Sequence, residues 1–137
     1  QVYKEFYKSS ENLFDLLQFP DIWTLGYFKW ELEFLETLGF GLDLEKCAVT
    51  GSTEDLKFIS PKSGCAVSEA AAGDWSSRLL PFPIAASGQV NSLEDVLDGL
   101  KVSQFFLEKK VLIAFGMEHL PSARSRFISS LERKIKN

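Results

Sequence analysis

Apolar side chains recur at near-helical spacing through residues 2–18 and again through residues 22–38. Pro20 separates the two stretches, because the residue before a proline is biased away from the helical conformation. Asp21 is then the expected N-cap of the second helix, and Gly39 is the expected stop signal at its C-terminal end. The N-terminal part of the chain therefore predicts two consecutive helices.

Two further helices are predicted in the C-terminal part of the chain. Ser92 is followed by acidic residues, which is typical of a helix N-terminus. The helical pattern continues from there to about Phe115, with a break expected near Gly99. Residues 116–119 are expected to form a loop, and Ser122 is the expected N-cap of the last helix.

A short β-hairpin is predicted between these two pairs of helices. Residues 56–60 and 65–68 have the pattern of strands, and residues 61–64 run from a proline to a glycine, as in many turns. Residues 68–72 can form a short helical turn. Residues 79–84 are apolar with two prolines, and we expect a loop that packs onto the core rather than a polyproline ligand. The predicted fold is mainly α, with a small β-hairpin inserted in a helical domain.

Two charged residues interrupt the apolar faces of the predicted helices. The apolar arc of helix 22–38 spans roughly 200°, and Glu31 lies inside it. Arg124 lies at the centre of the apolar stripe of the last helix. Because an unpaired buried charge is costly, we hypothesise that Glu31 and Arg124 form a partly buried pair that joins these helices. The alternatives are separate backbone partners, or an Arg124 side chain that extends to water.

The size and composition of the chain are those of one domain. It has 137 residues, of which 45% are hydrophobic, so that residues 1–137 are expected to form a single domain around one core. No apolar run is long enough to cross a membrane. The two cysteines, Cys47 and Cys65, can be small buried apolar residues, and a reducing cytoplasm is the expected compartment. The chain begins at Gln1 rather than at a methionine, and we expect it to be a fragment.

Motifs that support catalysis or metal binding are not found in the sequence. His119 is the one histidine, and without a second histidine it cannot build a His-based metal site. Neither cysteine has a CxxC partner, because Thr50 and Ser68 stand three residues after them. No nucleophile elbow, phosphate-binding P-loop or dinucleotide-binding glycine motif is present. We therefore expect no enzyme activity, no cofactor and no metal.

The charges are unevenly spread along the chain. The net charge is −4, but residues 108–137 hold 7 basic and 3 acidic side chains, whereas residues 1–107 hold 8 basic and 16 acidic ones. The C-terminal end is thus the part with a basic footprint for DNA or for an acidic peptide. The alternative interpretation is a solvated helix face without a partner.

Several motifs, taken in order, resemble the helical domain of the RecO family, especially in its alphaproteobacterial form. The most specific stretch is residues 30–44, and the weaker ones that follow are residues 47–51, 60–67, 79–81 and 120–124. The resemblance covers nearly the whole chain. It implies a bacterial, cytoplasmic DNA repair protein of the RecF pathway.

The resemblance implies a family whose members help to replace single-strand-binding protein with the recombinase RecA on single-stranded DNA and anneal complementary strands. These family members work with RecR. Their DNA-binding OB-fold precedes the helical domain, and this chain contains no comparable pattern of five strands. The resemblance therefore implies a fragment that lacks the principal DNA-binding surface and serves mainly as a protein-docking domain.

Many relatives carry a zinc site of two CxxC pairs at the hairpin. Here Cys47 is the one residue on a ligand position, Thr50 replaces its partner, and Cys65 precedes the expected second pair. Zinc is therefore not expected in this chain, and apolar packing must hold the hairpin.

The family's helical domain also binds the acidic C-terminal tail of single-strand-binding protein, which ends in Phe. Such a tail needs an apolar pocket for the ring and cations for the carboxylates. The candidate cations for this partner or for DNA are Lys29, Lys109, Lys110, Arg126, Arg133, Lys134 and Lys136.

Two other classes of function remain open from the residues alone. A helix-turn-helix regulator would use the basic last helix for recognition, but Pro121 and the long connection before that helix do not fit the motif. A small enzyme would need a polar cluster in a cavity, and the Glu31 and Arg124 pair is the one such cluster predicted.

Overall fold

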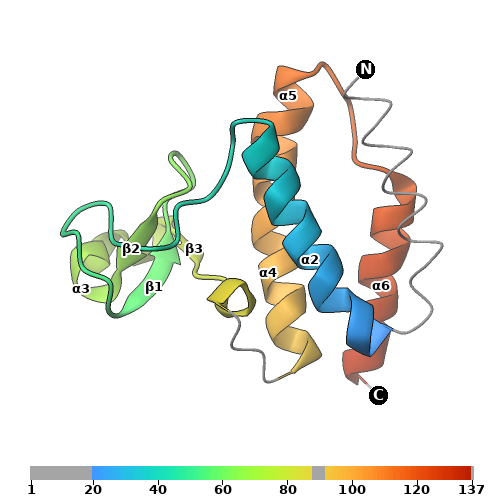
Figure 1. The fold of residues 1–137 in the computed structure, drawn as a ribbon, viewed down its shortest axis with the longest axis horizontal. Helices are drawn as coiled ribbons and strands as arrows, with labels where there is room; N and C mark the ends of the chain where they lie inside the picture. Colours follow the sequence, from blue (N-terminus) through green and yellow to red (C-terminus); the bar gives the residue numbers. More distant parts are fainter. Residues whose placement is uncertain (1–19, 88–91, 137) are drawn as a thin grey trace.

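The computed structural model describes residues 20–87 and 92–136, and three long helices dominate this part of the chain (Figure 1). They are α2 (Pro20–Thr37), α4 (Leu93–Phe106) and α6 (Ser122–Lys136), and they lie side by side. The small sheet lies beside them. The predicted helix at residues 2–18 falls outside the described residues.

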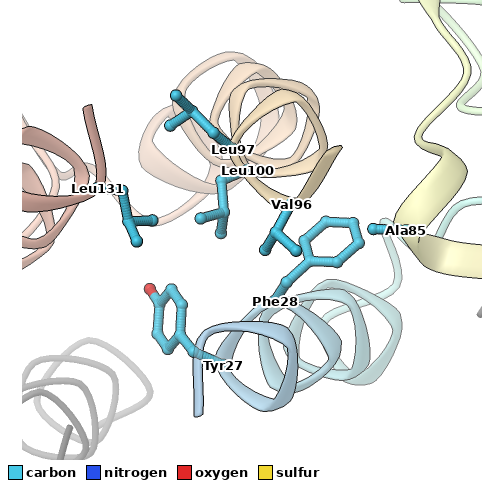
Figure 2. Close-up of a cluster of buried hydrophobic side chains, with 7 residues drawn as sticks. All are labelled: Tyr27, Phe28, Ala85, Val96, Leu97, Leu100 and Leu131. Carbon is cyan, nitrogen blue, oxygen red and sulfur yellow. The ribbon is translucent and has the colours of Figure 1, made fainter. Parts of the chain in front are cut away.

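The three helices bury a shared apolar cluster, which Figure 2 shows in close-up. In Figure 2 Phe28 of α2 lies against Val96 of α4, whereas Tyr27 of α2 points toward Leu131 of α6, and both aromatic side chains are almost fully buried. Phe127 of α6 packs edge-on against Tyr27, with ring centroids 5.2 Å apart. The cluster therefore contains side chains from all three helices, and it is completed by Ala85, Val96, Leu97, Leu100 and Leu131.

Helix α4 continues without a break at Gly99, so the predicted break there is wrong. The glycine is needed for packing, because a Cβ at this position would lie 2.7 Å from the Phe28 ring. The irregularity comes later, at a π-helical turn, η3 (Leu107–Val111), where Leu112 N–H donates to the Leu107 carbonyl five residues back. A final short turn, α5 (Leu112–Ala114), ends this long helical segment.

The predicted hairpin forms, and a third strand joins it. Strands β1 (Leu56–Ile59) and β2 (Ala66–Ser68) pair antiparallel, and β3 (Leu80–Pro81) pairs with the other edge of β1. The prediction of an irregular loop at residues 79–84 is therefore wrong over β3 and over the following 3₁₀ turn, η2 (Ile84–Ser87). Proline is accommodated in β3 because the strand lies at the sheet edge.

A short helical connection links the second strand to the third. Helix α3 (Glu69–Ala72) starts at Ser68, whose side chain accepts a hydrogen bond from Ala71 N–H, as expected of a helical turn at residues 68–72. A 3₁₀ helix, η1 (Gly73–Arg78), follows directly. These elements cover a small cluster in which Cys47, Val67 and Ala72 are buried.

A second apolar cluster joins the sheet to the helices. Ile59 of β1 packs with Leu35 of α2 and Phe106 of α4, and all three are buried. The turn between β1 and β2 approaches the same cluster at Gly64, which has a positive φ of 73°. A Cβ at Gly64 would lie 3.1 Å from Leu42 and 3.7 Å from Phe106, so the glycine permits this close approach.

The ends of the helices differ from the prediction at two positions. Asp21 lies within α2 rather than at its N-cap, since helix already begins at Pro20, a residue type favoured at the first helical position. Helix α6 begins at Ser122 itself. By contrast, Ser92 caps α4 in a capping box with Asp95, as its sequence pattern indicates.

The predicted fold class is confirmed for the described residues, which are mainly α with a small β-sheet inserted between α2 and α4. The extent of a single domain over residues 1–137 stays a prediction. None of the helices in residues 20–87 and 92–136 is long and apolar enough to cross a membrane.

Candidate functional site: a basic-rimmed pocket beside a buried charge pair

The helices α2, α4 and α6 form a helical layer, and Glu31 of α2 and Arg124 of α6 contact each other inside it. Arg124 Nε donates to Glu31 Oε2 at 2.8 Å and Arg124 Nη2 donates to Glu31 Oε1 at 2.7 Å, so the contact is bidentate. Their exposed fractions are 2% for Arg124 and 0% for Glu31. The structure thus contains the buried pair of Glu31 and Arg124 that was predicted from the apolar faces of the two helices.

Neutral groups complete the hydrogen bonding of this buried pair. Tyr27 and Ser103 each donate a hydroxyl hydrogen bond to the Glu31 carboxylate. Arg124 also donates to the Leu100 carbonyl at 2.9 Å and to Gln104 Oε1 at 2.8 Å. The pair therefore ties α2, α4 and α6 to one another, and truncating either partner leaves the other charge buried without it.

The buried charges also change how their neighbours titrate. Burial, and then the negative charge of Glu31, raise the pKa of Tyr27 well above its ordinary value. Burial alone acts to lower the pKa of Arg124, but the attraction of Glu31 outweighs it and raises that pKa. Tyr27 therefore stays neutral and Arg124 stays charged at any physiological pH. This arrangement supplies rigidity rather than a group that exchanges protons.

A separate pocket lies where the turn of the hairpin meets the helices. It has a volume of about 230 Å³ and combines apolar rings with cations. Phe40 follows α2, Phe106 comes from α4, Lys110 comes from the π-helical turn and Lys62 comes from the turn between β1 and β2. The remaining lining residues are Gly39, Gly41 and Ser63.

The pocket has the chemistry that an acidic, aromatic-ended peptide requires. Lys110 is half-buried and Lys62 is exposed, so both ammonium groups can reach an anion at the rim. No acidic residue contributes to the lining among the described residues. Phe40 is half-buried and supplies the accessible aromatic surface of the lining, whereas Phe106 is only 2% exposed and adds little to it. A ring can therefore contact Phe40 while carboxylates stay near the cations.

Of the predicted candidate cations, Lys110 lines this pocket and the others lie elsewhere on the described surface. Lys29 is exposed on α2, and Lys109 is exposed on the π-helical turn beside Lys110. Four exposed residues lie along α6, namely Arg126, Arg133, Lys134 and Lys136. Arg126 donates to the Ser122 hydroxyl oxygen at 3.3 Å. The sequence reasoning missed Lys62, Phe40 and Phe106.

The two cysteines near the hairpin do not belong to a set of metal ligands among the described residues. Cys47 Sγ accepts hydrogen bonds from the Thr50 hydroxyl and from the Ser68 backbone N–H, the latter at 3.3 Å. Cys65 is half-buried, with its Sγ 3.9 Å from the Ser63 carbonyl oxygen. Within the described residues, no group of three or more His, Cys, Asp or Glu side chains could hold a metal ion.

The hydrogen bonds to Cys47 also change how its thiol titrates. The bond from the Thr50 side chain, and then the bond from Ser68 N–H, lower the pKa of the Cys47 thiol to about 6, although burial acts to raise it. The loop is also closed by backbone bonds, since Gly51 N–H donates to the Cys47 carbonyl at 2.8 Å. Hydrogen bonding and apolar packing therefore hold this corner.

The fold is that of a mainly helical module whose small sheet meets the helices at a pocket with both apolar and basic lining residues. The family model described as "Recombination protein O C terminal" matches residues 1–116. The chain therefore belongs to the recombination protein O, or RecO, family.

The relatives of this chain are bacterial proteins named "DNA repair protein RecO". The protein of Ruegeria sp. (strain TM1040) is 48% identical over 135 residues, which make up 97% of this chain and 56% of the relative. That of Jannaschia sp. (strain CCS1) is 49% identical over 113 residues, or 82% of this chain and 46% of the relative. That of Roseobacter denitrificans is 38% identical over 136 residues, or 98% of this chain and 56% of the relative.

The chain spans about half the length of the curated relatives it matches. No solved structure matches the chain at a significant level.

Proposed function

We propose that this chain is the helical part of a DNA repair and recombination mediator of the RecF pathway. In this proposal the whole protein helps to load RecA onto single-stranded DNA and anneals complementary strands. This part serves mainly as a protein-docking domain for RecR and for the tail of single-strand-binding protein. Membership of the RecO family supports the general role.

The observation that carries the docking role is the pocket between Phe40, Phe106, Lys62 and Lys110. A cavity of about 230 Å³ is large enough for one aromatic side chain. The terminal Phe of an acidic tail would place its ring against the half-buried Phe40. Its α-carboxylate and neighbouring acidic side chains would then face the two lysines, as charge-assisted contacts require.

The role proposed for this part is binding rather than catalysis. Glu31 and Arg124 are paired with each other and closed to solvent, so they offer no accessible acid or base. The exposed cations of α6 are proposed as auxiliary contacts to DNA phosphates, which would make that contact dependent on salt.

The docking role is tested by titrating a labelled acidic peptide that ends in Phe, with fluorescence anisotropy as the readout. Lys110→Glu is expected to weaken binding at least about tenfold, because it replaces an attraction at the rim with a repulsion. Lys101→Glu is the matched control, because Lys101 is an exposed residue of α4 that does not line the pocket and the change in net charge is the same.

Two further conditions sharpen this test. Moderate salt is expected to weaken binding by the original chain, since carboxylate contacts at an exposed rim are screened. A peptide whose terminal Phe is replaced by Ala should lose most of its affinity, because the apolar contact is gone. Equal affinities for Lys110→Glu and Lys101→Glu would contradict the proposed site.

A further inference from the structure

A second apolar cavity lies on the sheet side of the molecule. Its volume is about 270 Å³, and it is bounded by Trp75 of η1 and by Val49 in the loop after Cys47. These two side chains are largely exposed, at 62% for Trp75 and 71% for Val49. The other lining residues are Ala48, Ser60, Ser63, Val67, Ala71, Ala72 and Leu79.

A cation accompanies the exposed aromatic ring at this cavity. The guanidinium carbon of Arg78 lies 5.0 Å from the centroid of the Trp75 ring, in a cation–π contact. Arg78 is itself exposed, so its remaining donors can bind an anion. The pocket lined by Phe40, Lys62 and Lys110 is called the docking pocket from here on. The second cavity resembles it in having apolar lining residues and a positive charge nearby.

The two cavities adjoin each other at the turn of the hairpin. Ser63 contributes to the lining of both, and its neighbour Lys62 lines the docking pocket. Within the described residues, no aspartate or glutamate contributes to the lining of either cavity. Ser63 therefore lies between the two cavities, with Lys62 and Lys110 in the lining of the docking pocket and Arg78 against the Trp75 ring of the second cavity.

We propose that the second cavity is an upstream subsite of the same docking groove. It takes an apolar side chain of the extended acidic peptide whose terminal Phe occupies the pocket at Phe40 and Phe106, while Arg78 faces a carboxylate of that peptide. This inference rests on the proposed function, and it names a second recognition element in the same partner.

The features of the cavity favour a peptide with spaced apolar residues. An apolar side chain in each cavity needs an extended segment between them, and the cations at both ends favour acidic residues in that segment. Linking two weak contacts through one chain raises affinity without any new contact, because the second contact becomes intramolecular. A nucleobase stacked on Trp75 is the competing occupant, and the experiment distinguishes it.

The experiment compares one short labelled acidic peptide with a series of longer ones, all of which end in Phe. The short peptide has only acidic residues before its terminal Phe, and the long peptides add one Leu at stepwise increasing distances upstream. With the original chain, the best long peptide is expected to bind about tenfold more tightly than the short one. Trp75→Ala and Arg78→Glu should remove most of this gain while they leave the affinity of the short peptide unchanged.

Trp23→Ala is the matched control, because Trp23 is also half-exposed, at 50%, but lines neither cavity. The subsite is overturned if no long peptide binds more tightly than the short one, or if the gain survives in both Trp75→Ala and Arg78→Glu. It is also overturned if these variants weaken binding of a single-stranded oligonucleotide instead. Loss of both peptides in Lys110→Glu supports the docking pocket separately, and failure of both with the original chain overturns the pocket and the subsite together.

Discussion

The helical layer and the sheet side, which comprises β1 to β3 with α3 and η1, differ in the size of their buried side chains and in how much apolar surface they expose. Between α2, α4 and α6, large side chains such as Phe28 and Leu100 are fully buried, and the buried pair of Glu31 and Arg124 makes a bidentate contact. On the sheet side, the buried cluster consists of the small residues Cys47, Val67 and Ala72, while Trp75 is largely exposed.

From this difference we propose that the helices supply rigidity and the sheet side supplies recognition. A layer with large buried side chains and no unpaired charge derives its stability from internal contacts. A small sheet with exposed apolar side chains and adjoining cavities leaves apolar surface that a partner can cover. We therefore expect mutations in the helices to change stability, and mutations on the sheet side to change binding.

The largest effect on stability is expected from breaking the buried pair. Arg124→Ala leaves Glu31 buried without its charge partner, and such changes cost about 3–5 kcal/mol in the free energy of unfolding. Replacing both residues, as in Glu31→Met with Arg124→Met, should recover most of that loss because no lone charge remains. Urea denaturation followed by circular dichroism measures both variants, and a cost below about 1 kcal/mol for Arg124→Ala would refute the role given to the pair.

A smaller effect is expected from two glycine substitutions that form a matched pair. Gly99→Ala should lower the free energy of unfolding by about 1–3 kcal/mol, because its Cβ would lie 2.7 Å from the Phe28 ring. Gly26→Ala should raise it by up to about 1 kcal/mol, since that glycine is exposed in α2 with nothing within 4 Å of its Cβ position. Opposite signs in thermal denaturation are the expected result, and equal signs would show that helix propensity outweighs the packing of Phe28.

On the sheet side, the Cys47 thiol is expected to titrate at a lower pH than an ordinary cysteine. In a Cys65→Ser background, the ultraviolet absorbance of the Cys47 thiolate is expected to rise with a midpoint near pH 6. Thr50→Val should move this midpoint upward, because the bond that contributes most to the lowered pKa is removed. An unchanged midpoint in Thr50→Val would exclude the hydroxyl as the cause.

The same titration links pH to stability with a definite sign. The folded pKa of Cys47 lies below the ordinary value of about 8.5, so the stabilisation is fully present above that value and is lost as pH falls through about 6. The difference in unfolding free energy between the original chain and Thr50→Val should therefore be larger at high pH than below pH 6. A difference that grows as pH falls would contradict this sign.

Adding a chelator is expected to have the smallest effect on stability. Because the described residues hold no set of metal ligands, a chelator should leave the melting temperature unchanged. Elemental analysis of the purified chain should accordingly find far less than one zinc per chain. One bound zinc per chain would show that hydrogen bonding does not account for the corner at Cys47.

The helices could be predicted from the sequence because their periodicity is local. The apolar arc of α2 and the stripe of α6 each contained one charge, and this placement pointed to the pair of Glu31 and Arg124 that the structure contains. The hairpin was also predicted, since a turn from Pro61 to Gly64 is a local signal.

What the sequence did not reveal depends on contacts between distant residues. Strand β3 has two residues, of which one is proline, so it has no strand pattern of its own and pairs only because β1 offers an edge. Gly99 was misread because its neighbour Phe28 lies in another helix. The docking pocket combines Phe40, Lys62 and Phe106, which no spacing along the chain relates.

The central claim is that partner recognition takes place at the junction of the sheet and the helices rather than along the basic helix α6. An acidic peptide with a photoreactive phenylalanine analogue at its C-terminus tests this directly, with mass spectrometry of the crosslinked fragments as the readout. The crosslinks are expected at residues 39–41, 62–63 and 106–110, which line the pocket or flank its lining residues. Crosslinks confined to residues 122–136 of α6 would contradict the claim.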